Sequence, residues 1–236
     1  ALPGEKEFYQ RYFRHEEQYG ELAGIVGKYC FRTTRHAVRS YLQIPYRVAH
    51  TALYSFSPEE KKVYSLLENY WNREEKHAFP AMEKYDLALL LSRTFSSSSA
   101  ALGKLVTGVI ERLGNDSESA VFQEILAAIQ KISLDTKAQL LLKSLRAGFA
   151  ELRKRGAAAK CLIFTENRAT QTMLESLLSS HWKTVCYHGG ADQSILKFQR
   201  EAQILIATDA ASEGFNLEFC SFLVNYGLPY NTLTVE

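Results

Sequence analysis

The chain has 236 residues, of which 46% are hydrophobic and 23% are charged, and its net charge is +2. This composition is ordinary for a soluble globular protein, and so small a net charge does not by itself indicate a partner. No pair of the four cysteines is spaced as Cys-x-x-Cys, which argues against zinc and thioredoxin-type sites. Because we find no apolar run long enough to cross a bilayer and no signal peptide, we expect a cytoplasmic protein without a metal site or a membrane partner.

Charge is distributed unevenly along the first half of the chain. No aspartate or glutamate occurs between Glu21 and Glu59, a window that contains several basic residues. Three of them, Arg32, Arg35 and Arg39, recur at helical spacing and therefore share one face. Such a face is usually just solvated, but the absence of nearby carboxylates makes contact with nucleic-acid phosphates an equal alternative.

Residues 1–134 are predicted to be mainly helical, with one short strand at 47–56. Ser57, Pro58 and Glu60 form a helix-start signal in which the serine and the glutamate can build a capping box. The helix that follows is predicted to end near Lys76, before Pro80. Further helices are expected at 85–91, 100–113 and 121–132, with a turn or a helix cap in the serine run 96–99.

From Asp135 onwards, helices alternate with short apolar runs typical of buried strands. Helices are predicted at 137–155, 170–178 and 193–199, and strands at 161–165, 184–187, 204–207 and 222–225. Alternation of this kind indicates parallel strands joined by right-handed crossovers. The predicted fold is therefore α/β: a parallel sheet flanked by helices at 135–236, preceded by the helical region 1–134.

Each predicted strand is followed by a polar or glycine-rich cluster. Ligands of such sheets bind beyond the carboxyl ends of the strands, so the four clusters should form one site. They are Thr165-Glu166-Asn167-Arg168, Tyr187-His188-Gly189-Gly190, Thr208-Asp209-Ala210-Ala211-Ser212-Glu213-Gly214, and Asn225-Tyr226-Gly227-Leu228-Pro229-Tyr230-Asn231.

These clusters, together with Thr170, Gln171 and the extension Phe215-Asn216-Leu217, resemble the second-lobe motifs of Swi/Snf-type superfamily-two helicases and translocases. The resemblance covers about residues 160–236 and is closer to distant bacterial members than to chromatin remodellers. It implies a RecA-like second lobe that belongs to a nucleic-acid-dependent ATPase. It also implies that the partners are DNA and a first RecA-like lobe. If the source is bacterial, it further implies an association with the nucleoid.

The resemblance assigns roles to individual residues. Hydroxyl groups and glycine-exposed amides suit phosphate oxygens without reading bases. The residues implied to contact the nucleic-acid backbone, together with the basic face described above, are Thr165, Asn167, Arg168, His188, Gly189, Gly190, Thr208, Arg32, Arg35 and Arg39. The residues implied to couple that track to the ATP cleft are Asp209, Glu213, Gly214 and Asn216.

The sequence also departs from the family pattern. It contains no phosphate loop and no acidic metal motif, and it stops before the arginine-finger motif. ATP and Mg²⁺ are therefore expected to act in a longer parent protein, with neither bound by this chain alone. We predict no catalytic residue within the chain and no ATP hydrolysis by it in isolation.

Other interpretations remain open at this stage. Thr208-Asp209 could simply cap a helix, and His188 could be a structural histidine. Glu166 beside Arg168 fits a salt bridge better than an acid/base pair. The whole chain could be a helical interaction module with an inactive RecA-like lobe. A Rossmann-type cofactor domain is less consistent, because Glu166-Asn167-Arg168 stands where its glycine-rich turn is required.

Overall fold

The computed structural model describes residues 4–13, 15–30, 48–187, 193–208 and 217–227, in two compact units, Ala1–Thr51 and Ala52–Glu236. The first unit contains the helices α1 (Glu5–Tyr12) and α2 (Tyr19–Val26), with the short 3-10 helix η1 (Glu16–Gln18) between them. Arg11 and Glu21 join α1 to α2 through an ion pair of 2.8 Å. The expected division at residue 134 falls inside the second unit and stays a prediction.

The second unit begins with four helices, α4 (Pro58–Trp71), α5 (Lys84–Ser97), α6 (Ser99–Leu113) and α7 (Ser119–Ile129). The predicted capping box is confirmed: the Glu60 amide donates to Ser57 Oγ at 3.2 Å, and the Ser57 amide donates to the Glu60 carboxylate at 2.6 Å. Ser98 caps α6 by accepting from the Ala101 amide at 3.0 Å, so the cap predicted in the serine run is also confirmed.

The predicted strand at 47–56 is wrong over its described residues, because 48–56 form no strand. An extended segment becomes a strand when a neighbouring strand satisfies its backbone groups. Here Phe56 packs instead on Phe95, with ring centroids 5.3 Å apart, and Leu53 is 88% exposed. The segment is thus a connection that enters α4.

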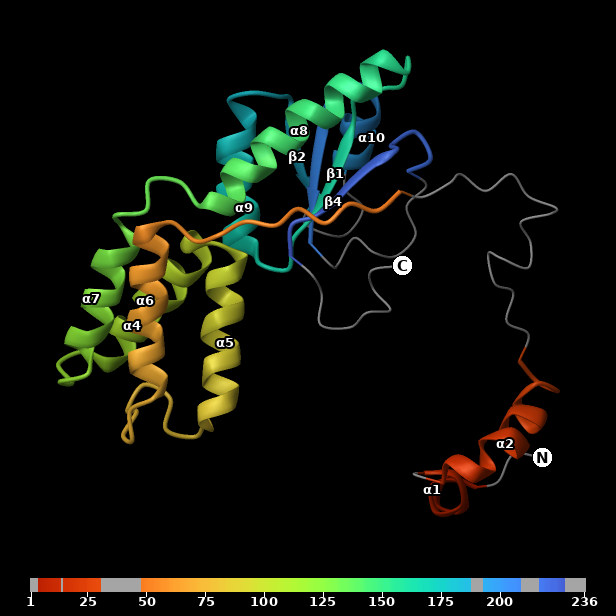
Figure 1. The fold of residues 1–236 in the computed structure, drawn as a ribbon, viewed down its shortest axis with the longest axis horizontal. Helices are drawn as coiled ribbons and strands as arrows, with labels where there is room; N and C mark the ends of the chain where they lie inside the picture. The colour runs from red at the N-terminus through yellow and green to blue at the C-terminus, as the bar shows by residue number, and fades with distance from the viewer. Residues whose placement is uncertain (1–3, 14, 31–47, 188–192, 209–216, 228–236) are drawn as a thin grey trace. The chain divides into compact units, whose positions relative to one another are not determined.

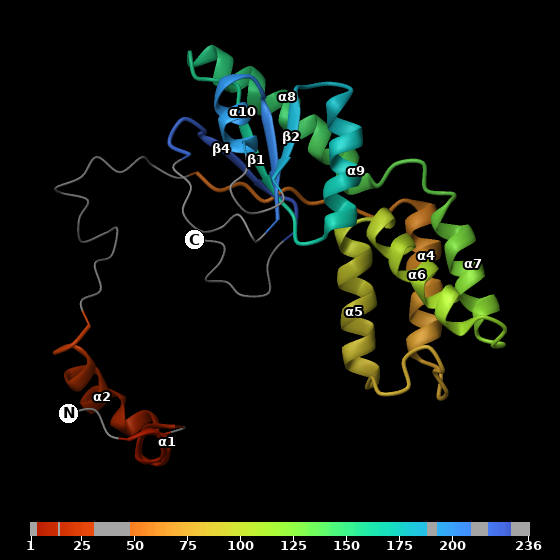
Figure 2. The same ribbon diagram turned by 180° about the vertical axis from the view of Figure 1, so that it is seen from behind.

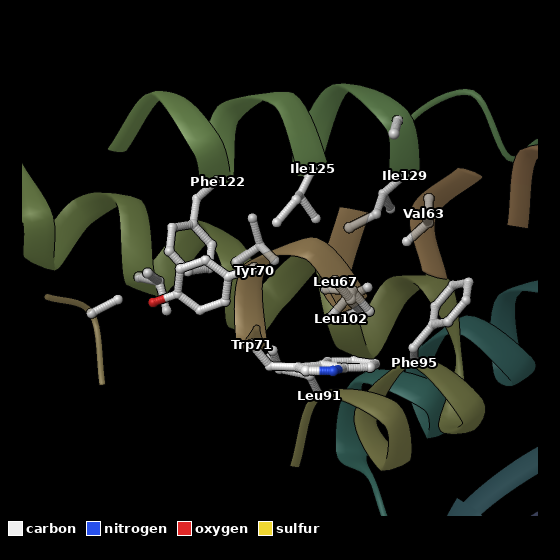
Figure 3. Close-up of a cluster of buried hydrophobic side chains, with 14 of the residues drawn as sticks. Val63, Leu67, Tyr70, Trp71, Leu91, Phe95, Leu102, Phe122, Ile125 and Ile129 are labelled. Atoms are coloured by element: carbon white, nitrogen blue, oxygen red, sulfur yellow. The ribbon is translucent and has the colours of Figure 1, made fainter. Parts of the chain in front are cut away.

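Helix α4 to helix α7 enclose a hydrophobic core of their own (Figure 3). At its centre the rings of Tyr70 and Phe122 meet edge-on with centroids 4.7 Å apart, a favoured aromatic geometry. The fully buried apolar side chains of this core include Val63, Leu67, Leu87, Leu91, Leu102, Val106, Phe122 and Ile125. This core makes the helical bundle a packed structure rather than a loose extension of the sheet.

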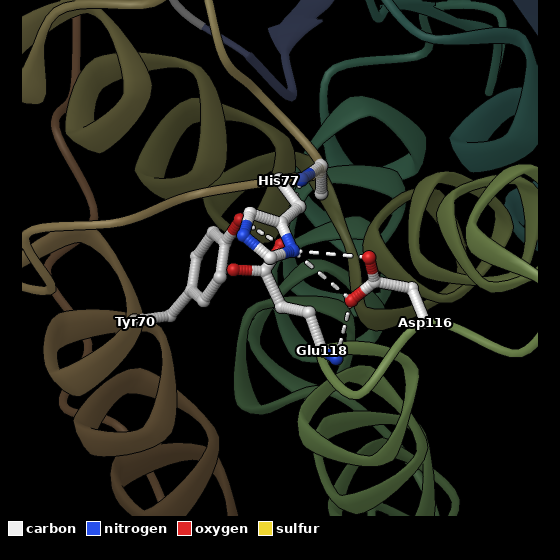
Figure 4. Close-up of polar contacts among 5 residues, drawn as sticks. Tyr70, His77, Asp116 and Glu118 are labelled. Carbon is white, nitrogen blue, oxygen red and sulfur yellow. Dashed lines mark hydrogen bonds and ion pairs between the residues drawn. The ribbon is translucent and has the colours of Figure 1, made fainter.

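A polar cluster fixes the connection between α4 and α5 against the start of α7 (Figure 4). The buried Glu118 carboxylate accepts from the Tyr70 hydroxyl at 3.1 Å and from the Ala78 amide at 2.7 Å. Outside it, His77 Nδ1 lies 3.0 Å from Asp116 Oδ2. Because Ala78 must reach Glu118, the chain leaves the helix early. Helix α4 therefore ends at Trp71 rather than near Lys76.

The rest of the second unit is an α/β lobe. Its elements are α8 (Thr136–Lys154), β1 (Cys161–Phe164), α9 (Arg168–Ser179), β2 (Thr184–Tyr187), α10 (Ser194–Arg200), β3 (Ile204–Ala207) and β4 (Phe222–Asn225). The strands pair in parallel in the order β2-β3-β1-β4, which confirms the predicted parallel sheet.

Helices cover both faces of this sheet (Figures 1 and 2). Side chains of α8 and α9, such as Leu145 and Leu174, pack with Ile163 and Ile206 on one face. On the other face Phe198 of α10 packs with Leu162 and Leu205. The two central strands, β1 and β3, are therefore buried on both faces, which explains why each of them is an unbroken apolar run in the sequence.

Two helical glycines make a matched test of this packing. A Cβ at Gly148 of α8 would lie 2.7 Å from Phe222 Cζ, whereas a Cβ at Gly108 of α6 meets no atom within 4 Å. Gly108→Ala should therefore stabilise the chain by about 0.5–1 kcal/mol through helix propensity. Gly148→Ala should destabilise it by about 1–3 kcal/mol, because it overpacks the contact with Phe222. Urea unfolding measures both changes, and equal shifts would contradict the packing.

Candidate nucleic-acid interface at the carboxyl edge of the sheet

Thr165 and Thr208 lie side by side at the carboxyl edge of the sheet. They follow Phe164 and Ala207, which are partners in the β1–β3 register, and the Thr165 amide donates to the Ala207 carbonyl at 3.0 Å. Thr208 is half-buried, whereas Thr165 is only 2% exposed. The Thr165 hydroxyl is buried without a hydrogen-bond partner among the described residues. The sheet thus brings together two of the predicted contact residues, of which Thr208 is the more accessible.

The connection from β1 to α9 carries the next two predicted contacts. The Asn167 side chain caps α9 by accepting from the Ala169 amide at 2.8 Å. Arg168 is the first residue of α9 and is exposed. Between β1 and this cap, Glu166 pairs at 2.8 Å with Arg93 of α5 rather than with Arg168. An exposed arginine at this edge is compatible with the predicted phosphate contact.

Thr170 and Gln171 connect this edge to the rest of the unit, and we had assigned them no role from the sequence. The Thr170 hydroxyl lies 2.7 Å from the hydroxyls of both Ser97 and Ser98. The Gln171 amide nitrogen donates to the last carbonyl of β2, that of Tyr187, at 2.9 Å. It also donates to the Ile206 carbonyl of β3 at 3.0 Å. The sequence signals are their place among the residues that carry the family resemblance and two polar residues on a helical face that must be buried.

Several predicted site residues lie outside the described parts of the chain, and their roles stay predictions. They are the predicted contacts Arg32, Arg35, Arg39, His188, Gly189 and Gly190, and the predicted coupling residues Asp209, Glu213, Gly214 and Asn216.

A second polar region joins the helical bundle to the lobe, and two buried carboxylates form it. Glu60 of α4 accepts from the Thr136 amide at 2.9 Å and from the Thr136 hydroxyl at 2.6 Å, so it caps α8. Asp135 in turn accepts from the Ser99 amide at 3.0 Å, at the start of α6. We call these two contacts the crossed caps. Each carboxylate satisfies amides at the beginning of a helix other than its own, where the helix dipole favours negative charge.

Lys137 lies next to the crossed caps. Its Nζ donates to the Ser96 carbonyl at 2.8 Å and lies 4.3 Å from the centre of the Tyr226 ring. Burial lowers the pKa of Lys137 to about 8, although Asp135 and Glu166 oppose the shift, and burial likewise raises the pKa of Asp135. A recess lined by Lys137, Asp135, Ser96, Tyr54 and Phe56 has a volume of about 10 Å³. This volume is enough for one water molecule at most and not for a nucleotide.

The described ranges contain no group of three or more side chains suited to holding a metal ion. Within the same ranges, no helix is long and apolar enough to span a membrane. The sequence also lacks a phosphate loop, so the described residues show no group that would hold ATP or Mg²⁺.

A parallel sheet covered by helices on both faces, with polar groups gathered at its carboxyl edge, defines a RecA-like α/β lobe. Residues 136–236 match the family model of the helicase conserved C-terminal domain. The predicted resemblance of this part of the chain to the second lobe of superfamily-two helicases is therefore confirmed.

Two proteins that the chain resembles in sequence are ATP-dependent helicases. The chain is 28% identical over 226 residues to the uncharacterized ATP-dependent helicase YqhH of Bacillus subtilis, covering 93% of the chain and 38% of that relative. It is 36% identical over 83 residues to the DEAD-box ATP-dependent RNA helicase RhpA of Helicobacter pylori, covering 32% of the chain and 17% of that protein. The C-terminal part of the Fun30 ATPase domain superposes with a TM-score of 0.49 at 16% identity, covering 75% of the chain and 74% of that structure.

Removing one of the crossed caps tests the junction. Glu60→Ala would leave the amides of Ser57 and Thr136 without their acceptor in a buried place, where Glu60 is 3% exposed. We expect a loss of about 2–4 kcal/mol in the free energy of unfolding. The exposed neighbour Glu59 is the control, since Glu59→Ala should cost less than about 1 kcal/mol. A loss of similar size in both variants would contradict the capping role.

The lowered pKa of Lys137 predicts a pH dependence. Because the folded pKa of about 8 lies below the ordinary 10.5, the unfolded chain binds more protons between these values. The contribution of Lys137 to stability is present above pH 10.5 and is lost as the pH falls through 8. Relative to Lys137→Met, the wild-type chain should therefore gain stability between pH 8 and 10. Urea unfolding at several pH values measures this, with the exposed Lys131→Met as control; a pH-independent difference would contradict the shift.

Proposed function

We propose that this chain supplies the second motor lobe of a Swi/Snf-like, nucleic-acid-dependent ATPase. In this role the carboxyl edge of the sheet grips the sugar-phosphate backbone, while a first lobe provides the phosphate loop and the Mg²⁺ site. The observation that supports it best is the position of the half-buried Thr208, directly after β3 and beside the end of β1, in the part of the chain that matches the helicase conserved C-terminal domain. Hydroxyl groups at such an edge suit phosphate oxygens.

ATP use and the identity of the track belong to the same proposal. Both named relatives are ATP-dependent helicases, but the chain spans 38% and 17% of their lengths. DNA is the proposed track, and RNA is the alternative that the DEAD-box RNA helicase relative favours. The proposed location is the cytoplasm, at the nucleoid if the source is bacterial.

Two other functions are weaker. An interaction module with an inactive lobe is compatible with the separate core of the helical bundle. However, it would not require hydroxyl groups at the strand ends. In the Rossmann alternative a glycine-rich turn would have to follow β1, where the structure has Glu166 paired with Arg93 and Asn167 capping α9.

The substitution Thr208→Val tests the proposed contact with the nucleic-acid backbone. It is made in the longer protein that contains this chain. The substitution keeps the shape of the side chain and removes its hydroxyl group. We expect nucleic-acid-stimulated ATP turnover to fall about tenfold at subsaturating DNA, as for the loss of a hydrogen bond to a charged group. Thr107→Val, at an exposed position of α6, is the control and should leave stimulation unchanged.

Running the assay with duplex DNA and with RNA identifies the track. Full stimulation of Thr208→Val on both would remove the assigned role. ATP turnover by the pure 236-residue chain would show that no other lobe is needed.

A further inference from the structure

We propose that Thr170 and Gln171 position the nucleic-acid-facing edge, so that the helical bundle determines how the lobe grips its track. This inference rests on the proposed function. The two residues are consecutive at the start of α9, and their side chains point to different partners: Thr170 contacts the bundle and Gln171 contacts the sheet. They form a direct polar link from the end of α5 to the strand ends.

Gln171 acts on the sheet. Its single amide group donates to the last carbonyl of β2 and to the penultimate carbonyl of β3, and its side chain is 2% exposed. Helix α9 itself follows β1, so one buried side chain ties together the ends of three strands. The carbonyls that it holds lie immediately before the connection that begins at His188 and just before Thr208. Its position therefore sets the spacing between the last carbonyl of β2 and the penultimate carbonyl of β3, close to Thr208.

Thr170 acts on the bundle. Its side chain is fully buried, and its hydroxyl group lies 2.7 Å from Ser97, which ends α5, and 2.7 Å from Ser98, which caps α6. Ser98 Oγ also accepts from the Ala101 amide, so the same hydroxyl group serves the cap of α6 and the start of α9. A shift of α5 or α6 would therefore move α9.

Arg93 also contacts the connection between β1 and α9. Its ion pair with Glu166 fixes the residue that lies between Thr165 and Asn167 in the sequence. The pair is partly exposed, with 44% and 34% of the two side chains accessible. Exposed pairs contribute little to stability, which suggests that its value lies in orientation. Three contacts from the bundle thus meet the first turn of α9 and the residues directly before it.

The test measures how the 236-residue chain and its variants bind a fluorescein-labelled DNA duplex, by anisotropy at several salt concentrations. Circular dichroism first identifies a temperature at which every variant is folded. Thr170→Val and Gln171→Met remove the polar groups and keep the side-chain volume. Thr170→Ser retains the hydroxyl group, and Gln139→Met changes an exposed glutamine of α8.

We expect Thr170→Val and Gln171→Met to bind the DNA duplex about tenfold more weakly than the wild-type chain. The salt dependence of their affinity should be reduced by the equivalent of about one or two phosphate contacts. Thr170→Ser and Gln139→Met should match the wild-type chain in both measurements. A purely structural role would lower the unfolding midpoint but leave affinity and salt slope unchanged while the variants stay folded. That outcome would overturn the positioning role of Thr170 and Gln171 and leave the proposed nucleic-acid grip intact. If the wild-type chain did not bind the duplex, both proposals would be overturned.

Discussion

The second unit depends on the crossed caps between buried carboxylates and helix starts. Glu60 belongs to the helical bundle and caps α8, while Asp135 precedes α8 and caps α6. A buried carboxylate is costly unless charge-assisted hydrogen bonds compensate it. Each carboxylate therefore stays favourable only while the other helix remains in place. The bundle and the lobe have separate hydrophobic cores, and this polar junction, together with the contacts of Thr170 and Arg93, registers one against the other.

The carboxyl edge of the sheet inherits its geometry from that junction. Helix α8 starts at the crossed caps, and Lys137, one residue beyond Thr136, reaches both Ser96 of α5 and the ring of Tyr226 after β4. The contacts of Thr170 approach the same serine run from α9. The serine run thus contacts α9, which follows β1, directly, and it is linked to Tyr226, which follows β4, through Lys137. A grip on a phosphate backbone requires such rigid support, because contacts to phosphate depend on where the donors are held.

Patterns that a single element determines were predictable from the sequence. Short apolar runs identified the strands, most clearly β1 and β3, which are buried on both faces and have no polar position, and Ser57 with Glu60 identified the start of α4. The end of α4 was not predictable, because Glu118 determines it from 40 residues away through the Ala78 amide. The strand expected at 47–56 failed for a related reason: β-propensity alone supplies no neighbouring strand to pair with.

The candidate site shows the same division. Strand-end positions made Thr165 and Thr208 neighbours by topology alone, and the register bears this out. The burial of Thr165 and the two bonds of Gln171 depend on where α9 crosses the sheet, which no local pattern specifies. Glu166 illustrates the consequence: Arg168 lies two residues away in sequence, yet the carboxylate pairs with Arg93, which lies 73 residues earlier. Proximity in sequence therefore identifies the groups available at this edge, whereas the position of α5 determines the partner of Glu166.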